Sequence, residues 1–404
     1  MSSLSPLSPR TRAILDILGP FLSSIRDSTY ARRQHEPGIL DFMLGDPHEP
    51  PLPGITEAIQ RWSVPQDNHW FAYKLSEPQA QAAVAAALRQ RRGIPFAAED
   101  ILMTTGAFGA LANSLLALAG EDDEVVFISP PWFFYEAMIA AAGATPVRVA
   151  VQPGTFDLDL DALAAAITPR TRVVLVNSPH NPTGKIYPPE TLERLAKLLR
   201  EASERHGRPI YLISDESYSR IVYDGRAFHS PAAYYPYTVL IYTFGKTLLA
   251  PSQRLGYIAL PPDMPEREQV HLAIMMRQVV GGYGFPNAVM QYAVGDLEEL
   301  SIDIDHLQRK RDRVVAALRE MGYEVHTPEG TFYLLPRSPW ADDLAFTELL
   351  ATHDIFVLPG ASIEVPGYFR VSLTASDDMI DRALPGFAAA IAHARTHAPA
   401  AAGG

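Results

Sequence analysis

The sequence contains no cysteine in its 404 residues. This absence excludes a disulfide framework and any chemistry that needs a thiolate. No stretch reaches the roughly 18–20 apolar residues that a helix needs to cross a bilayer. The N-terminus also lacks an apolar run followed by a small-residue cleavage site, so we find no signal peptide. We therefore expect a soluble cytoplasmic protein without membrane contact.

The sequence also has fewer basic residues than acidic ones. Lysine and arginine together number 34 against 46 aspartate and glutamate residues, which gives a net charge of −12. Such a balance disfavours non-specific binding to nucleic acid or to an anionic membrane. The length suffices for two domains with a sizeable core, and the hydrophobic fraction of 47% is ordinary for a globular protein.

Apolar runs alternate with helical segments between residue 45 and about residue 265. The clearest predicted strands cover residues 124–128, 147–150, 173–176, 210–214, 239–243 and 257–260, and a further short strand is predicted at residues 101–103. The clearest predicted helices cover residues 77–91, 110–119, 134–142, 158–166 and 189–206. This alternation predicts a mostly parallel sheet with helices on both faces.

The two ends of the chain differ from this pattern. A helix is predicted at residues 9–24 with Ser8 as its N-cap, followed by a short strand near residue 40. A long charged helix over residues 302–320 opens an α+β region, so we place a domain boundary near residue 300. We expect the tail, residues 396–404, to be disordered.

The most informative segment surrounds one lysine. Lys246 lies three residues after Thr243 and eight before Arg254, and it directly follows the strand at residues 239–243. An amine in this setting can form a Schiff base with an aldehyde, while a hydroxyl and a guanidinium hold a phosphate; pyridoxal phosphate carries both groups. Ligand sites in open α/β sheets gather at the carboxyl ends of strands. The alternative is an ordinary solvated lysine.

Two segments upstream of Lys246 support its interpretation as a Schiff-base lysine. Asp215 ends an apolar strand and is followed by Tyr218, and Asn181 stands in the turn sequence Asn-Pro-Thr-Gly. A carboxylate there can keep a pyridine nitrogen protonated, because a nearby opposite charge favours the charged form. The alternatives are a helix N-cap for Asp215 and a simple turn for Asn181.

Together, the segments around Asn181, Asp215 and Lys246 resemble the class I/II aminotransferases, the aspartate-aminotransferase-like group with the type I pyridoxal-phosphate fold. The resemblance extends from Gly45 to Ser376. It implies an α/β fold: a large domain, residues 46–300, with a mostly parallel seven-stranded sheet flanked by helices, and a smaller α+β domain, residues 1–45 and 301–404. It also implies pyridoxal 5'-phosphate as cofactor and a homodimer with active sites at the interface.

The resemblance implies roles for the residues that would surround the cofactor ring. Lys246 would form the Schiff base and act as general base, and Asp215 would face the ring nitrogen. Asn181 and Tyr218 would hydrogen-bond the phenolic oxygen of the cofactor. Trp132 would stack on the ring, although a buried core tryptophan is the alternative.

Further assignments concern the two ends of the site. The phosphate would be held by Gly106, Ala107 and Phe108 at a strand-to-helix turn, together with Thr243 and Arg254. Tyr73 would reach the phosphate from the partner subunit, but Phe71 competes for this place, and Pro78 stands where the family often has glycine.

The substrate α-carboxylate would be clamped by Arg370, because guanidinium suits bidentate binding. Gly45 and Asn181 would contribute to the same substrate site. No metal site is predicted.

The implied activity moves an amino group from an L-amino acid to a 2-oxo acid by a ping-pong mechanism. Gly245 departs from the family, where serine or alanine is more usual, and either loosens the lysine's backbone or makes room for a larger substrate. The donor side chain stays open. Lys74 is a candidate partner for a second carboxylate, whereas an apolar pocket lined by Trp70, Phe71, Tyr283, Phe285 and Phe332 favours a neutral or aromatic donor.

Two other functions remain in view. The same lysine and aspartate serve C–S lyases and other Cα or Cβ chemistry on this fold. A non-catalytic protein that has kept the fold is the other, and the apparently complete catalytic set argues against it.

Overall fold

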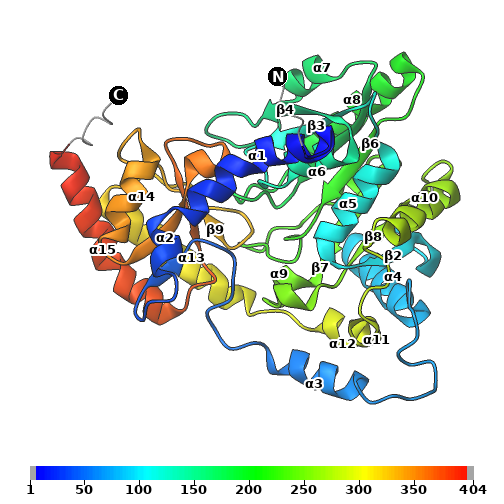
Figure 1. Ribbon diagram of the computed structural model, residues 1–404, viewed down its shortest axis with the longest axis horizontal. Helices are drawn as coiled ribbons and strands as arrows, with labels where there is room; N and C mark the ends of the chain where they lie inside the picture. The colour runs from blue at the N-terminus through cyan, green and yellow to red at the C-terminus, as the bar shows by residue number, and fades with distance from the viewer. Residues whose placement is uncertain (1–5, 398–404) are drawn as a thin grey trace.

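A computed structural model describes residues 6–397 of the chain. It contains two sheets with helices packed around each (Figure 1). The seven-stranded sheet has the order β2 (Ile101–Thr104), β8 (Gly256–Ala259), β7 (Thr238–Thr243), β6 (Tyr211–Asp215), β5 (Thr171–Asn177), β3 (Glu124–Ser129) and β4 (Thr145–Ala150). β8 is antiparallel to both of its neighbours, and the other pairs are parallel. The predicted α/β fold with a mostly parallel seven-stranded sheet is confirmed.

Helices cover both faces of this sheet. Its central strands are almost continuous apolar runs, and such strands have to be buried on both sides. Val125 of β3 packs in the cluster with α5, α6 and α10, whereas its neighbour Val126 packs on the opposite face with α7 and α8. The helices of the first face are α5 (Gly106–Leu118), α6 (Tyr135–Ala142) and α10 (Arg267–Val280). Those of the second are α7 (Leu160–Ala166) and α8 (Pro189–His206), with α3 (Pro53–Trp62), α4 (Pro78–Arg92), α11 (Ala288–Tyr292) and α12 (Val294–Glu299) around the β2 end.

The second sheet has four strands in the order β1 (Leu40–Phe42), β10 (Ile355–Pro359), β11 (Phe369–Ser372) and β9 (Tyr333–Leu334). Its helices are α13 (Ile304–Met321), α14 (Asp343–Ala351) and α15 (Asp377–Thr396). β1 pairs with β10 in parallel, so the N-terminal strand joins a sheet that is otherwise built from the last third of the chain.

The first helices connect the two parts. α1 (Pro9–Arg26) packs on α6, and the rings of Phe21 and Phe133 stack at 4.3 Å, whereas α2 (Thr29–Arg33) lies beside α14 (Figure 1). The predicted N-cap is present, since Ser8 Oγ accepts a hydrogen bond from the backbone N–H of Thr11 at 3.2 Å. The assignment of residues 1–45 to the small domain stays a prediction, because α1 contacts the large layer while β1 belongs to the small sheet.

Two expectations need correction. The helix predicted to begin at Ala110 begins at Gly106, because the glycine of the turn is itself the first residue of α5. The tail predicted as disordered from residue 396 includes Thr396, which is the last residue of α15, and His397; the remainder lies outside the described residues. Within residues 6–397, no helix is both long and apolar enough to cross a membrane.

Candidate active site

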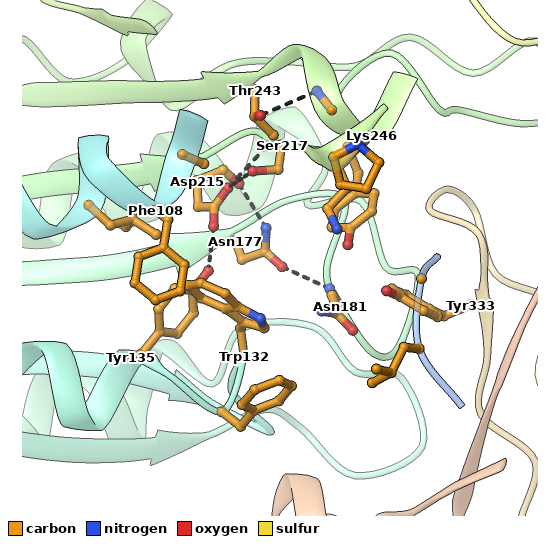
Figure 2. Close-up of a pocket in the computed structure, with 18 of the residues that line it drawn as sticks. Phe108, Trp132, Tyr135, Asn177, Asn181, Asp215, Ser217, Thr243, Lys246 and Tyr333 are labelled. Carbon is orange, nitrogen blue, oxygen red and sulfur yellow. Dashed lines mark hydrogen bonds between the residues drawn. The ribbon is translucent and has the colours of Figure 1, made fainter. Parts of the chain in front are cut away.

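A cavity opens at the carboxyl ends of three adjacent parallel strands, where β5 ends in Asn177, β6 in Asp215 and β7 in Thr243 (Figure 2). This is the edge at which open α/β sheets bind ligands. Most of the predicted site residues line it, namely Gly45, Ala107, Phe108, Trp132, Asn181, Asp215, Tyr218, Thr243, Lys246, Arg254 and Arg370. Gly106 lies directly behind the lining, and Tyr73 lies outside it.

Lys246 lies in a single helical turn, α9 (Phe244–Thr247), at the end of β7. Its Nζ lies 5.7 Å from the ring centre of Tyr218 and 5.8 Å from that of Phe332. The lysine is therefore held at the cavity between aromatic faces rather than on open surface. Thr243 begins the turn, and its hydroxyl accepts a hydrogen bond from Gly245 N at 3.3 Å.

Asp215 is buried, with donors on both of its carboxylate oxygens. The Tyr135 hydroxyl donates to Oδ2 at 2.6 Å, and Ser217 donates to Oδ1 from its hydroxyl at 2.6 Å and its backbone N–H at 3.1 Å (Figure 2). Burial and the neighbouring carboxylate raise the pKa of Tyr135 well above its usual range, so this hydroxyl remains a donor. Neither Tyr135 nor Ser217 was predicted. Ser217 lies two residues after Asp215, as in an Asx turn, and this spacing is a signal that sequence reading could have used.

A chain of polar contacts connects Asp215 to the substrate side of the cavity. Asn177 Nδ2 donates to Asp215 O at 2.8 Å, and Asn177 Oδ1 accepts from Asn181 N at 2.8 Å. Asn181 Oδ1 in turn accepts from Nη1 of Arg370 at 3.1 Å. The orientation of Asn181 is thus fixed from both sides, and Asn177 is a third site residue, after Tyr135 and Ser217, that was not predicted.

The opposite end of the cavity suits an anion. α5 has 13 residues and begins at Gly106, so its first backbone N–H groups face this end without helical partners. Arg254 reaches across and donates to Thr105 O at 3.1 Å. A Cβ at Gly106 would lie 3.1 Å from Arg254 Nη2, and one at Gly256 would lie 2.9 Å from Gly106 Cα. These two glycines allow the guanidinium and the helix terminus to approach one another.

The Thr243 hydroxyl has two partners in this structure. It donates to Leu255 O at 3.1 Å and accepts from Gly245 N. Because the hydroxyl proton is already donated to Leu255 O, a hydrogen bond from Thr243 to a phosphate oxygen requires that this proton turn away from Leu255. Its predicted role in phosphate binding stays a prediction.

Arg370 is buried on β11, where its guanidinium lies 4.0 Å over the ring of Tyr333. Nη2 donates to Met43 O at 3.0 Å, but Nε has no partner among residues 6–397. A buried guanidinium with an unused donor is suited to an anionic ligand. Gly45 lies against the same ring, since a Cβ there would come 2.5 Å from the Tyr333 hydroxyl oxygen.

Tyr333 itself lines the cavity and was not predicted. Burial alone would raise its pKa, but the charges of Arg370 and Lys246 and a hydrogen bond with Tyr218 outweigh this and lower the pKa of Tyr333. The pKa of Tyr218 is raised well above its usual range, first by burial and then by Tyr333.

The predicted apolar pocket for the donor side chain is largely absent from this cavity. Among the residues named for it, Trp70 instead stacks on Tyr292 at 3.7 Å, and Phe71 is exposed. Lys74 is also placed elsewhere, because it forms an ion pair of 3.1 Å with Glu77. Phe332 is the exception, through its contact with Lys246.

Two departures from the family pattern have structural explanations. A Cβ at Gly245 would lie 3.0 Å from Pro251 Cα, so the glycine permits close packing of α9 on the next loop. Pro78 is the first residue of α4, a position where proline costs nothing because that N–H has no helical partner. Tyr73, in the preceding loop, is 88% exposed and packs only on the ring of Phe285 among aromatic side chains.

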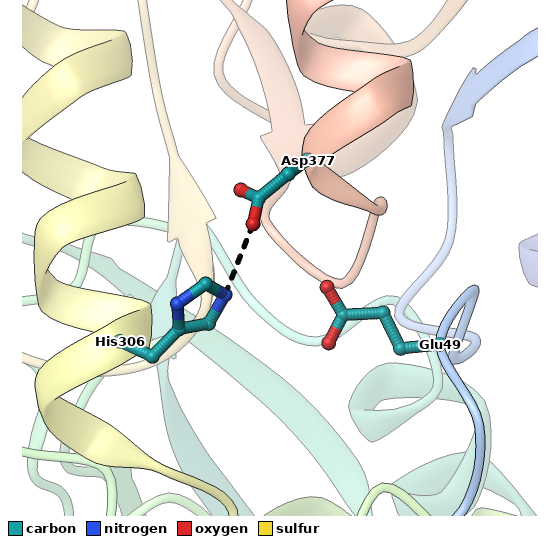
Figure 3. Close-up of side chains that lie close together, drawn as sticks. All are labelled: Glu49, His306 and Asp377. Atoms are coloured by element: carbon teal, nitrogen blue, oxygen red, sulfur yellow. Dashed lines mark ion pairs between the residues drawn. The ribbon is translucent and has the colours of Figure 1, made fainter.

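One group of side chains elsewhere has the ligand types of a metal site. Glu49, His306 and Asp377 bring their ligand atoms within 4.8 Å of one another (Figure 3). However, Lys310 donates to Glu49 at 2.9 Å, and His306 pairs with Asp377 at 3.4 Å. These contacts connect α13 to α15 and to the segment after β1, and the lysine's charge opposes a cation.

Comparison with known proteins agrees with the fold. The family model described as aminotransferase class I and II matches residues 37–387. The aspartate/prephenate aminotransferase of Thermus thermophilus is 30% identical over 370 residues, covering 88% of this chain and 92% of that protein. A probable N-succinyldiaminopimelate aminotransferase of Mycobacterium tuberculosis is 31% identical, covering 76% of this chain and 77% of that protein.

Solved structures give the same result. An aminotransferase from Eubacterium rectale superposes with a TM-score of 0.86 at 27% identity, covering 96% of this chain and 99% of that chain. An aspartate aminotransferase from Thermus thermophilus with maleate superposes with a TM-score of 0.79 at 27% identity, covering 96% of this chain and all of that chain. The family model and these relatives identify an enzyme that transfers nitrogenous groups. The chain belongs to the class I and II aminotransferases, whose two half-reactions follow one another at a single site.

Proposed function

We infer that this aminotransferase uses pyridoxal 5'-phosphate held by the cavity residues named above and takes a neutral or aromatic L-amino acid as donor. The preference for a neutral or aromatic donor rests on the number of cationic side chains that line the cavity. Among the described residues that line the cavity, the cationic ones are Lys246, Arg254 and Arg370. Each has a task already, so this chain's own lining leaves no cation for a side-chain carboxylate.

The donor set supports this cofactor. The start of α5 and Arg254 offer N–H groups to a phosphate, the buried Asp215 offers a carboxylate to a protonated ring nitrogen, and Lys246 offers an amine to an aldehyde. Trp132 and Phe108 supply the aromatic wall, with ring centres 5.2 Å apart. When bound, pyridoxal phosphate supplies an electron sink for negative charge at Cα of the amino acid.

The chain's own residues then perform the proton transfers and the binding. Lys246 Nζ removes the Cα proton of the substrate and later returns a proton, because it is the one amine among the described residues that line the cavity. Arg370 binds the α-carboxylate with the donors of its buried guanidinium, including the unpartnered Nε. Tyr135 and Ser217 hold the Asp215 carboxylate in one orientation through their hydrogen bonds to its two oxygens.

A homodimer is part of the proposal. Tyr73 and Phe285 are both exposed and pack on each other at 4.9 Å, and neither lines the cavity of its own chain. Exposed aromatic side chains of this kind are enriched at protein interfaces. We infer that Tyr73 reaches the phosphate end of the partner's cavity; sedimentation of the purified protein tests the dimer.

The experiment that tests the donor class is a visible absorption titration of the holoenzyme with single amino acids and no oxo acid. Phenylalanine and leucine should convert the cofactor to its amine form, and aspartate should not. Conversion by aspartate at comparable concentrations contradicts the donor class. Catalytic release of ammonia without any acceptor contradicts transamination and favours a lyase. Lys246→Ala is the control variant that should abolish conversion with every donor.

A further inference from the structure

The cavity has two groups of apolar lining residues, and they belong to different parts of the fold. Ala107, Phe108 and Leu111 pack in the cluster around α5, at the end of the cavity that suits a phosphate. Leu44 and Phe133 pack instead with the cluster that α8 shares with the small sheet. The second group therefore gives the cavity an apolar side that lies away from the phosphate end.

This apolar side adjoins the residues assigned to the α-carboxylate. Met43, the residue before Leu44, accepts a hydrogen bond from Arg370 Nη2 on its carbonyl oxygen at 3.0 Å. Gly45, the residue after Leu44, is assigned to the same carboxylate. The side chain of an amino acid is attached to the carbon that carries this carboxylate. Because the nitrogen and the proton on that carbon have to face Lys246, the side chain is left to the apolar side.

The ring of Phe133 is held in place from the N-terminal helix. Phe133 lies in the short segment between β3 and α6, and Phe21 of α1 stacks on its ring with the centres 4.3 Å apart and the planes 26° from parallel. Phe134 contacts it as well, at 4.5 Å. Stacked aromatic pairs attract one another beyond the burial of their surface. The position of this part of the cavity wall therefore depends on α1.

We propose that Phe133 determines donor specificity: its ring is the wall on which the side chain of the amino acid packs, and Phe21 positions that ring. The side chains that fit are aromatic or large aliphatic ones, because both gain by burial against an apolar ring. Phe133 touches the substrate, whereas Phe21 acts only through Phe133. This inference rests on the proposed function and names the part of the site that receives the donor side chain.

The test compares phenylalanine with alanine as donors for the holoenzyme of Phe133→Ala. We expect kcat/KM for phenylalanine to fall about tenfold or more, a usual loss when a hydrophobic pocket loses apolar contact, while kcat/KM for alanine stays within about twofold. The ratio of the two values is measured on one folded protein, so a loss of stability does not affect it. Phe133→Leu should lower the same ratio if the alanine variant does not fold. An unchanged ratio overturns the proposal.

A double-mutant cycle tests the role of Phe21. Phe21→Ala should lower the ratio of phenylalanine to alanine by less than Phe133→Ala does, because the wall is loosened rather than removed. In the double variant Phe21→Ala should cause no further decrease, since residues that act through one another are not additive. Leu22→Ala, at the exposed next position of α1, is the matched control and should leave the ratio unchanged. Additive losses would contradict the positioning role of Phe21.

A binding measurement without turnover separates this proposal from the proposed function. Calorimetry of the holoenzyme with 3-phenylpropanoate and with propanoate gives the preference for the larger side chain, and Phe133→Ala should reduce this preference about tenfold. If the preference falls but no amino acid converts the cofactor in wild type, the proposed function fails while the role of Phe133 stands. If amino acids convert the cofactor but neither the kinetic nor the binding ratio responds to Phe133→Ala, the donor side chain lies elsewhere and the proposal is overturned.

Discussion

The Tyr135 hydroxyl donates a hydrogen bond of 2.6 Å to Oδ2 of Asp215, and this bond joins the first turn of α6 to the end of β6. The contact is buried on both sides. It holds the carboxylate in one orientation at the cavity, with Ser217 fixing the other oxygen at 2.6 Å. A carboxylate oriented in this way can meet a protonated ring nitrogen without first reorganising.

Removal of this hydroxyl should therefore slow catalysis more than it lowers stability. A hydrogen bond to a charged group is worth about 1.5–3 kcal/mol, so Tyr135→Phe should lower kcat about ten- to hundredfold. The measurement is steady-state kinetics at saturating cofactor, with thermal unfolding alongside. Tyr187→Phe is the matched control, because the Tyr187 hydroxyl is buried without a partner and its loss should be neutral or stabilising. Equal kinetics for wild type and Tyr135→Phe would contradict the role of this bond.

Arg370 should not be replaceable by lysine. Its guanidinium stacks on Tyr333 and donates to Asn181 and Met43 O, a planar arrangement that one ammonium cannot reproduce. Arg370→Lys should cost about 1.5–3 kcal/mol, or roughly 10- to 150-fold in kcat/KM for the amino donor. Arg337→Lys, on the exposed surface of the same part of the chain, should change nothing. A similar loss with an amine substrate that has no carboxylate would show that the effect is not carboxylate binding.

The sequence predicted the large sheet and most of the cavity because both follow from local patterns. Apolar runs mark the strands, and Asp215, Thr243 and Lys246 each stand where a strand ends, so a parallel sheet brings them to one edge. Tyr135 could not be found in this way, because its contact with Asp215 spans 80 positions and it is one of 17 tyrosines. The assignment of Trp70 to the pocket failed for a similar reason. Its stacking partner Tyr292 lies 222 positions away in the sequence, and the stacking holds Trp70 outside the cavity.

The role of Gly245 was left open by the sequence, which allowed either a looser backbone at Lys246 or more room for the substrate. The structure adds a packing reason for the glycine. The Cβ of any other residue would lie 3.0 Å from Pro251 Cα, tighter than an ordinary contact. Gly245→Ser should therefore force α9 and the next loop apart and cost about 1–3 kcal/mol of unfolding free energy. Thermal unfolding measures this, and the absorption of the bound cofactor reports any displacement of Lys246. Gly120→Ala, where no atom lies within 4 Å of the new Cβ, is the control. Unchanged stability of Gly245→Ser would indicate instead that the glycine serves to make room for the substrate.

Glu216 follows Asp215 but faces away from the cavity, into a buried polar cluster. Its carboxylate accepts hydrogen bonds from the hydroxyls of Ser214 and Ser230, and Arg92 lies 3.8 Å away. Burial raises the pKa of Glu216 to about 7, although Arg92 and the two serines work in the opposite direction. The ion pair is thus too long to offset the loss of hydration.

The raised pKa of Glu216 predicts that its contribution to the free energy of unfolding falls as the pH rises. Between the ordinary glutamate pKa of about 4.3 and the folded pKa of about 7, the folded chain binds a proton that the unfolded chain has lost. The stability that this group contributes is therefore fully present below about pH 4.3 and is lost as the pH rises to about 7, by about 4 kcal/mol at most. The side chain of Glu216→Gln cannot titrate. The free energy of unfolding of this variant should therefore increase relative to that of wild type as the pH is raised from 5 to 8. Denaturant unfolding across this pH range gives the difference between the two proteins, in which all other titrating groups cancel. A constant difference would mean that Glu216 is ionised in the fold throughout, with Arg92 as an effective counter-ion.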